Sequence, residues 1–471
     1  MAIQLEETAG VGGSICRRVT LTPQARLLLE GPVLPTLLKM AAPTVALMLL
    51  QGVIAAGEAA FVGRLGSHAL AGVSLSFPLV MLMTTLSAGA YGGGVASGVA
   101  RALGAGRSDD AAKLAGTALG ISAILGLAST AAMMLFGRTF YAVLGATGAA
   151  LEAAVFYSDV LFLGAVPFWL FNAAASVLRG GGNTVYPAIA GAVGGLVTLA
   201  VSPLVIFGAG SVSGLGIAGA AWAVVAYNIA MAMVLLRAVW APGSPTRQSC
   251  RALVPQWGYA FEILRVSVPS AASTLLSNLT FIILTALVVP FGTEATAGYG
   301  AAGRLEYLLI PFVFGVGSAL VPLVAASDGA GDIGRVRTLT RAGAALGAGG
   351  CGLVGGTAAL FPWAWMGLFT SDPTVAGFGG AYLVRVGPAY AFLGLGLALY
   401  FAAQGRGRTT QPLLATFTRL LVAGALGVLA LRVFGWGIDS LFALMACGLV
   451  LYGMVMVAVM RRELGFHAGG R

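Results

Sequence analysis

Long apolar runs separated by short polar segments fill most of the chain between residues 33 and 460. About 20 consecutive apolar residues are enough for a helix to cross a bilayer, whereas a transmembrane β-strand shows only a short alternation of apolar and polar positions. The runs are continuous, so the pattern predicts an all-α integral membrane protein with twelve spans. The expected spans are 33–63, 69–100, 111–136, 151–178, 185–208, 214–240, 262–291, 295–327, 338–368, 375–403, 411–434 and 438–460.

The second half of the chain repeats the first. An offset of 225 residues aligns LRGGGNTVYP at 178–187 with AQGRGRTTQP at 403–412, and Tyr157 with Tyr382. Ungapped agreement over such a distance is hard to produce by composition alone, so it indicates a duplication. Further aligned pairs, at 225 or 226, are 37–43 with 263–269, 104–106 with 329–331, Gly66 with Gly292, and Ala71 with Ala297.

The duplication predicts two six-helix bundles, related by a pseudo-twofold axis along the membrane normal and arranged around a central cleft. Parallel repeats of this kind are a known transporter architecture. The expected domain bounds are 1–32 for a cytoplasmic N-terminal tail, 33–240 for the first bundle, 241–261 for a cytoplasmic linker, 262–460 for the second bundle and 461–471 for a cytoplasmic tail.

The composition excludes a water-soluble enzyme. Only 9% of the side chains are charged and 58% are apolar, whereas a soluble chain carries about 25% charged residues. The four cysteines and two histidines lack metal-ligand spacing, and no GxxxxGK[ST] loop is present to bind ATP. We therefore expect no cofactor, no bound metal and no enzyme activity, and energy that comes from an ion gradient, from a partner or from neither.

Basic residues set the expected orientation. If the N-terminus lies inside, twenty Lys and Arg residues fall in inner segments and three in outer segments, which is the bias that orients membrane proteins. The net charge of +10 does not indicate a nucleic-acid partner, because the bases stand singly between apolar runs. We expect a multi-pass protein of the bacterial inner membrane, a monomer in the lipid bilayer with both termini in the cytoplasm.

Glu58 is the acid that points most directly to function. It lies in the first span, about 8 Å below the outer surface by helical rise, and no base lies one turn away on its apolar side. Burial without a cationic partner favours the protonated form of a carboxylate, as a proton-coupling site requires. The alternative is a solvated Glu58 at the rim of an outer vestibule.

Depth then selects the partners of Glu58. Tyr157 in the fourth span and Ser202 in the fifth lie at a similar level, and Thr198 lies one turn deeper. These hydroxyls could line one outer cavity with Glu58. The alternatives are an interfacial role for Tyr157 and bonds from Thr198 and Ser202 to their own helix.

A second candidate cleft site lies in the other half. Arg304 and Glu306 share the eighth span at a spacing of two, so they do not face each other. Arg385 in the tenth span is a candidate mate for Glu306 or Asp159. The alternative is a structural ion pair.

Six segments together resemble the multidrug and toxic compound extrusion (MATE) transporters. The resemblance implies twelve helices in two bundles, a V-shaped central cleft, and proton- or cation-coupled export of organic, often cationic, compounds. The segments are 43–48, FVGRLGSHALAGVSLSFP at 61–78, GAGRSDDAAKLAG at 104–116, 178–187, SPLVIFG at 202–208 and GLGIAGAAWA at 214–223.

The resemblance also implies site residues. Glu58 takes the place of the first-helix acid of the family, Tyr157 that of a fourth-helix tyrosine, and Asn172 that of an asparagine further along. Thr198 and Ser202 stand where relatives with a proton site in this bundle carry an asparagine and an aspartate, so the second acid is absent.

The resemblance leaves the coupling ion between H⁺ and Na⁺. Relatives with a sodium site in the second bundle carry acids on the seventh and tenth helices, where this chain has Ser277, Asn278 and the apolar 392–393. We therefore expect an antiporter that exports small organic cations against protons, with sodium as the alternative. The sequence also leaves open a lipid-linked precursor flippase, a membrane enzyme and a passive channel.

Overall fold

The computed structural model describes residues 4–5, 19–20, 23–143, 145–209, 212–242, 244, 246 and 254–464. Within these ranges, eleven helices are long and apolar enough to cross a membrane, and a helix pair bent by 51° adds a twelfth span. The bent pair consists of α6 (Gly148–Leu163) and α7 (Ala165–Gly180). The prediction of an all-α membrane protein with twelve spans is confirmed. Most of the expected tail 1–32, much of the linker 241–261 and residues 465–471 lie outside the described ranges.

The contacts divide the chain into two compact units. Unit 1 contains Met1–Gly31 and Ala46–Leu264, and unit 2 contains Pro32–Val45 and Arg265–Arg471. One of the three divisions lies between two helices, just before α2 (Val33–Gly63), and the other two fall inside continuous helices, α2 and α10 (Trp257–Val288). The expected bundles 33–240 and 262–460 follow helix ends instead, and they stay a prediction.

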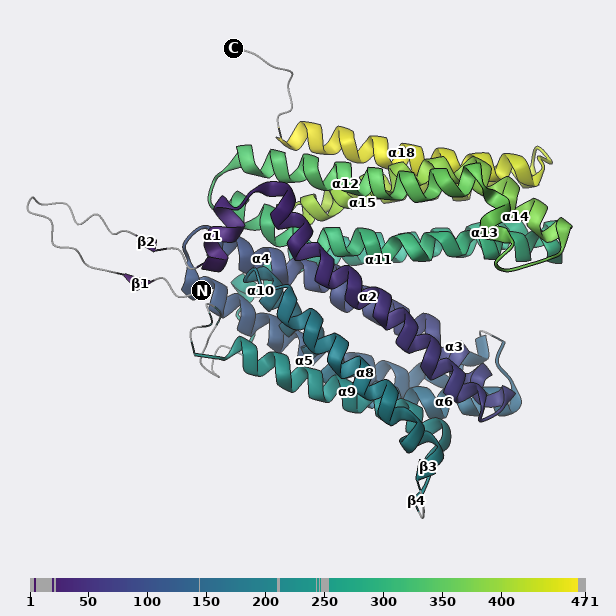
Figure 1. Ribbon diagram of the computed structural model, residues 1–471, viewed down its shortest axis with the longest axis horizontal. Helices are drawn as coiled ribbons and strands as arrows, with labels where there is room; N and C mark the ends of the chain where they lie inside the picture. The colour runs from purple at the N-terminus through teal and green to yellow at the C-terminus, as the bar shows by residue number, and fades with distance from the viewer. Residues whose placement is uncertain are drawn as a thin grey trace, which may run out of the picture. The chain divides into compact units, whose positions relative to one another are not determined.

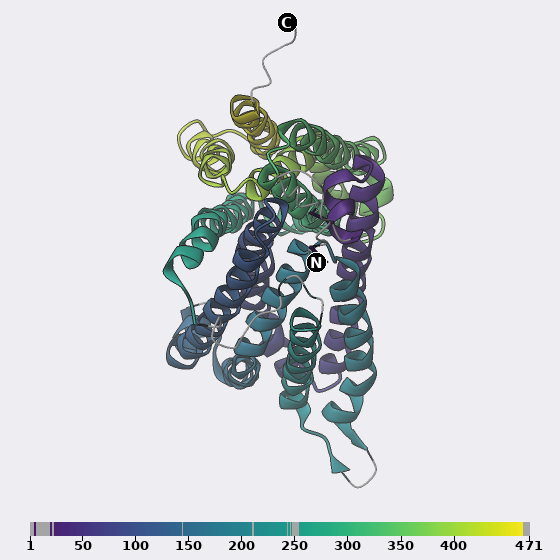
Figure 2. The same cartoon turned by 90° about the vertical axis from the view of Figure 1, so that its left-hand side faces the viewer.

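Unit 1 consists mainly of long helices with two short strand pairs. In two views the β3–β4 pair projects beyond the neighbouring helices α8 and α9 (Figures 1 and 2). Its elements besides α2 and α10 are β1 (Gln4–Leu5), β2 (Val19–Thr20), α1 (Pro23–Glu30), α3 (Ser67–Thr84), the π-helical η1 (Thr85–Tyr91), α4 (Gly92–Gly104), α5 (Ser108–Val143), α6, α7, α8 (Val185–Phe207), β3 (Gly208–Ala209), β4 (Val212–Ser213) and α9 (Gly216–Val239).

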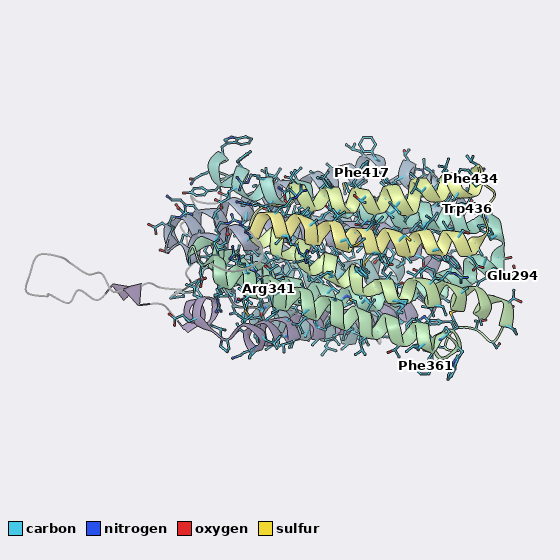
Figure 3. The ribbon with its side chains drawn as sticks, turned by 90° about the horizontal axis from the view of Figure 1, so that it is seen from above. Glu294, Arg341, Phe361, Phe417, Phe434 and Trp436 are labelled. Atoms are coloured by element: carbon cyan, nitrogen blue, oxygen red, sulfur yellow. The ribbon has the colours of Figure 1, made fainter. Side chains whose placement is uncertain are left out.

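Unit 2 is helical throughout its described part. Its exposed side chains include the aromatic residues Phe361, Phe417 and Phe434 (Figure 3). Besides the parts of α2 and α10, its elements are the 3₁₀ segment η3 (Val289–Phe291), α11 (Thr293–Gly329), α12 (Ile333–Leu360), α13 (Pro362–Met366), α14 (Pro373–Val386), the 3₁₀ segment η4 (Gly387–Ala389), α15 (Tyr390–Gly405), α16 (Thr410–Arg419), the π-helical η5 (Leu420–Ala425), α17 (Leu426–Arg432) and α18 (Ile438–Leu464).

Specific contacts explain the unit bounds. The start of α10 belongs to unit 1 because Glu262 pairs with Arg101 of α4 at 3.0 Å and the Tyr259 hydroxyl donates to Asp110 of α5 at 2.9 Å. The start of α2 belongs to unit 2 because Val45 lies directly on Gly315 of α11. Polar pairs therefore hold the start of α10 in unit 1, and apolar packing holds the start of α2 in unit 2.

The duplication extends to the helix ends. The span from α6 to α7 covers 148–180 and the span from α14 to α15 covers 373–405, so both ends differ by 225. The same offset relates α8 to the span 410–432, and the last residue of α9 to the last residue of α18. Sequence positions 225 apart therefore hold equivalent places in their own units from residue 148 onward.

A glycine pair repeats in conformation as well as in sequence. Gly66 and Gly292 precede equivalent helices with φ of 113° and 107°. A residue with a Cβ rarely adopts this region, so glycine is required at both turns. The next turn, at Gly106 and Gly331, repeats with φ of 75° and 77°.

Helix α12 packs closely on α15 through small residues. A Cβ on Gly347 would lie 2.5 Å from the carbonyl oxygen of Gly394 and 3.0 Å from the Cβ of Ala398. Small residues at such positions let transmembrane helices approach along their backbones, which compensates for the weak hydrophobic drive inside lipid. The close approach of α12 to α15 therefore depends on the absence of a side chain at Gly347.

We predict that Gly347→Ala lowers the free energy of unfolding by about 1–3 kcal/mol, because the new methyl group forces α12 from α15. Gly349→Ala is the matched control, since a Cβ there meets nothing within 4 Å. Thermal unfolding of the two purified variants in detergent checks this. Equal melting temperatures would contradict the proposed close packing.

Candidate functional site

Glu58 lies on the face of α2 that packs on α8. Leu47, Gln51, Ile54 and Glu58 follow one another at spacings of four, three and four, which places them on one side of a helix. The Glu58 side chain is half-buried, and among the described residues no Lys or Arg forms an ion pair with it. The expected lone carboxylate is therefore present in the structure.

The facing side of α8 has the same spacing. Its residues Gly191, Gly195, Thr198 and Ser202 form one stripe. A Cβ on Gly191 would lie 3.3 Å from Cδ1 of Leu47, and a Cβ on Gly195 would lie 2.6 Å from Cδ1 of Ile54. The glycines thus allow α8 to approach α2.

These contacts fix the register between the two helices. A Cβ on Gly57 would lie 2.8 Å from Cδ1 of Leu199, which extends the same parallel pairing. The paired positions differ by 141 to 144 residues, so Glu58 comes opposite residues 199–202. Ser202 therefore lies at the level of Glu58, and Thr198 lies one turn deeper, as the depth argument predicts.

Two tyrosines complete the surroundings of Glu58. Tyr157 of α6 is 9% exposed, and its hydroxyl lies within electrostatic range of the Glu58 carboxylate. Tyr227 of α9 also lies within electrostatic range of Glu58, interacts with Gln51, and donates to the carbonyl of Gly191 at 3.5 Å. Sequence reasoning found Tyr157 but missed Tyr227 and Gln51. The spacing of seven between Gln51 and Glu58 is the signal that could have found the glutamine.

The two α8 hydroxyls differ in their hydrogen bonds. Thr198 Oγ1 donates to the carbonyl of Gly194 at 2.8 Å within its own helix. Ser202 is 1% exposed, and its Oγ has no hydrogen-bond partner among the described residues. A buried hydroxyl without a partner costs free energy, so Ser202 is the hydroxyl that is free to bind a ligand or the carboxylate.

Asn172 forms its hydrogen bond within its own helix. It belongs to α7, beyond the bend that follows α6, and its Nδ2 donates to the carbonyl of Phe168 at 3.0 Å. The neighbouring Phe171 ring packs on Tyr227, which reaches Gly191. The amide nitrogen of Asn172 is therefore engaged within α7, and its role beside Glu58 stays a prediction.

The second candidate site does not form as expected. Glu306 pairs with Arg419 at 3.3 Å, and Arg385 pairs with Asp439 at 3.1 Å. Arg304 is exposed and lies over the ring of Phe369, with 5.3 Å from its guanidinium carbon to the ring centroid. The predicted pairing of Arg385 with Glu306 or Asp159 is wrong. The reason is that α14, which carries Arg385, packs on α18, which carries Asp439.

The polar side chains at the positions considered for a sodium site form hydrogen bonds to backbone carbonyls of their own helix. Ser277 Oγ donates to the carbonyl of Ser273, and Asn278 Nδ2 donates to the carbonyl of Thr274, both at 2.9 Å. A search of the described residues finds no group of three His, Cys, Asp or Glu side chains that could hold a metal ion.

The comparisons with known proteins agree with the duplication. The family model MatE matches residues 43–204 and again residues 269–429. A protein of Shewanella oneidensis described as a FAD transporter is 26% identical over 407 residues, covering 84% of this chain and 87% of that protein. The probable multidrug resistance protein NorM of Thermotoga maritima is 26% identical over 388 residues, covering 82% and 83%.

Solved structures share the fold. A MOP superfamily transporter from Pyrococcus furiosus matches with a TM-score of 0.86 at 23% identity, over 95% of this chain and 99% of that chain. An outward-facing multidrug resistance MATE family transporter matches with a TM-score of 0.85 at 23% identity, over the same shares. These matches confirm the fold that the resemblance implies.

We predict that Ser202→Ala leaves the melting temperature unchanged, because no hydrogen bond is lost, but weakens substrate binding by about threefold to tenfold. The matched control is Ser129→Ala, whose hydroxyl accepts from Trp169 Nε1 at 3.2 Å. That change should lower the free energy of unfolding by about 1–2 kcal/mol. A large loss of stability in Ser202→Ala would show that its hydroxyl is already paired.

Proposed function

Because this chain belongs to the MatE family of transporters, we propose that it is a secondary active antiporter that exports organic, amphipathic cations in exchange for protons by alternating access. As a member of a transporter family it is a multi-pass membrane carrier and not an enzyme. The proposal further assigns it to the bacterial inner membrane, as a monomer with both termini in the cytoplasm. The distribution of Lys and Arg and the bacterial relatives support that assignment.

The observation that carries the proposal is the half-buried Glu58, which has no basic partner within the described part of the chain. A carboxylate in a poorly hydrated site is stable either protonated or beside a cation. The same group can therefore hold a proton or a cationic substrate, and the two ligands exclude each other. This competition is the elementary requirement for exchange.

The cycle follows from this competition. When the site is open to the outside, a proton binds Glu58 and removes the charge that held the cation, which then leaves. When it is open to the cytoplasm, the proton departs and a new cation binds. A difference of one pKa unit between the two states corresponds to about 1.36 kcal/mol, so a modest change in surroundings couples the two fluxes.

Neighbouring hydroxyls would set the affinity. Tyr157 and Ser202 lie at the level of Glu58 and can donate hydrogen bonds to its ionised form. Tyr157 and Tyr227 also present aromatic faces, to which organic cations bind favourably. Thr198, one turn deeper, and Asn172 of α7 would contribute further polar groups to substrate binding.

Flux of a fluorescent organic cation from proteoliposomes tests the proposal. A proton gradient and a sodium gradient are imposed separately on vesicles that contain the full chain. We expect transport driven by the proton gradient alone. Transport driven only by sodium would favour the alternative coupling ion, and equilibration without either gradient would indicate a channel.

We predict that Glu58→Gln lowers proton-driven flux by about tenfold or more, because the amide can neither titrate nor balance a cation. Glu58→Asp should retain part of the flux. The control is Glu152→Gln, which removes an exposed acid of the same unit that pairs with Arg138. Normal export by Glu58→Gln would overturn the assignment.

A further inference from the structure

The duplication repeats a pair of tyrosines in unit 2. We call each pair a tyrosine frame: Tyr157 and Tyr227 in unit 1, and Tyr382 and Tyr452 in unit 2. The offset of 225 that relates the helix ends also relates Tyr157 to Tyr382, and Tyr227 to Tyr452. In unit 1 both tyrosines lie within electrostatic range of Glu58. In unit 2 an acid and a base, Glu306 and Arg419, lie beside the equivalent tyrosines, so the two frames have different charged neighbours.

The unit 2 cluster centres on one ion pair. Arg419 Nη2 lies 3.3 Å from Glu306 Oε1, and the Tyr382 and Tyr390 hydroxyls are 3.1 Å apart. Tyr382 lies within electrostatic range of both charges, and Tyr452 within range of Arg419. The group draws its side chains from α11, α14, α15, α16 and α18.

Arg419 stands where unit 1 has a glycine. Its equivalent at the offset of 225 is Gly194, against which the Tyr227 ring packs in unit 1. The same tyrosine frame therefore surrounds an acid alone in the described part of unit 1, but an acid with a guanidinium in unit 2. The first arrangement favours a cation, whereas the second is neutral and includes a donor group.

The guanidinium is not saturated by its partner. Arginine has five N–H donors, and among the described residues only Glu306 accepts a hydrogen bond from Arg419. The two side chains are 14% and 20% exposed, so they are not sealed from small molecules. A purely structural buried pair would need its remaining donors satisfied to offset the desolvation of both charges.

The backbone around the pair is irregular. Arg419 is the last residue of α16 and directly precedes the π-helical η5. Tyr382 and Tyr390 stand on either side of the 3₁₀ segment η4. Short π-helical segments inside α-helices are frequent at functional sites, because they re-aim side chains at the expense of regular hydrogen bonding.

We propose that Arg419, with the neighbouring tyrosine hydroxyls, binds an anionic group in unit 2, an organic carboxylate or phosphate, and that Glu306 holds this place when no ligand is bound. Guanidinium groups bind carboxylate and phosphate through parallel N–H donors. The incoming anion exchanges with the Glu306 carboxylate, so the guanidinium keeps a counter-charge, and the displaced carboxylate, which is 20% exposed, is balanced by water. Arg304 and Arg385 do not take part, since their partners are Phe369 and Asp439.

Binding of hexyl phosphate and hexanoate to the full chain in phosphatidylcholine nanodiscs tests the proposal, with hexylammonium as the cationic probe. Arg419→Gln should weaken binding of both anions by about tenfold or more. Glu306→Gln should tighten it severalfold, because the competing carboxylate is removed. Discs that also contain phosphatidylglycerol separate the two sources of the ligand: loss of hexyl phosphate binding there identifies a lipid headgroup, and unchanged binding identifies a soluble anion.

Two controls keep the result interpretable. The double variant Glu306→Gln/Arg419→Gln avoids an unpaired charge, so it should fold and bind neither anion. Arg385→Gln, in the exposed pair of the same unit, should bind as the unaltered chain does. Anion binding that survives in the double variant, or equals that of hexylammonium throughout, would overturn the proposal. Glu58→Gln should leave anion binding unchanged, so failure of proton coupling and failure of this site are distinguishable.

Discussion

A charged side chain inside a bilayer is stable only if it has a partner, changes its protonation or is reached by water. The acids and bases within the spans of this chain differ in how they meet this constraint. Glu306 and Arg385 have partners of opposite charge, and Arg304 is exposed over an aromatic ring. Glu58 has no basic partner among the residues that the structure describes, so protonation, a cationic ligand or water must balance it. The functional reading of unit 1 depends on this difference more than on any single contact.

Glycine makes the arrangement of the polar groups possible. Gly191 and Gly195 let α8 approach α2, and their stripe continues into Thr198 and Ser202. The same face therefore changes from glycines that receive the side-chain ends of Leu47 and Ile54 to hydroxyl groups at the level where Glu58 lies. In lipid, where apolar burial drives helix association only weakly, small residues that let helices approach and a few polar contacts determine the register. A larger residue at either glycine would meet the end of Leu47 or Ile54, whose side chain would have to change its rotamer.

The sequence was sufficient for the spans, the duplication and the acid, but not for most pairings. Span positions follow from apolar length, and the repeat follows from residue identity, so both are local properties. Ser202 and Tyr157 were found because depth follows from helical rise. The partners of Glu306 and Arg385 could not be found in this way, because Arg419 and Asp439 lie 113 and 54 residues away and the pairing depends on helix packing. Tyr227 was missed for the same reason, since its hydroxyl reaches the site from a neighbouring helix.

Duplication explains how one fold can hold two differently charged groups. The tyrosine pairs and helix ends are kept at a constant offset, whereas the charged residues are not: Glu58 comes from α2, which the duplication aligns with α10, and Glu306 comes from α11, which it aligns with α3. Tyrosine tolerates either sign of charge, because its hydroxyl both donates and accepts and its ring face attracts cations. The ligand that each tyrosine pair favours then depends on the charged residues beside it, which are Glu58 in unit 1, and Glu306 with Arg419 in unit 2. The group in unit 1 changes its net charge when Glu58 takes up a proton. The pair in unit 2 is neutral until an anion binds Arg419 in place of the Glu306 carboxylate. Energy coupling and anion recognition can therefore diverge within one duplicated scaffold without either unit losing its helix packing.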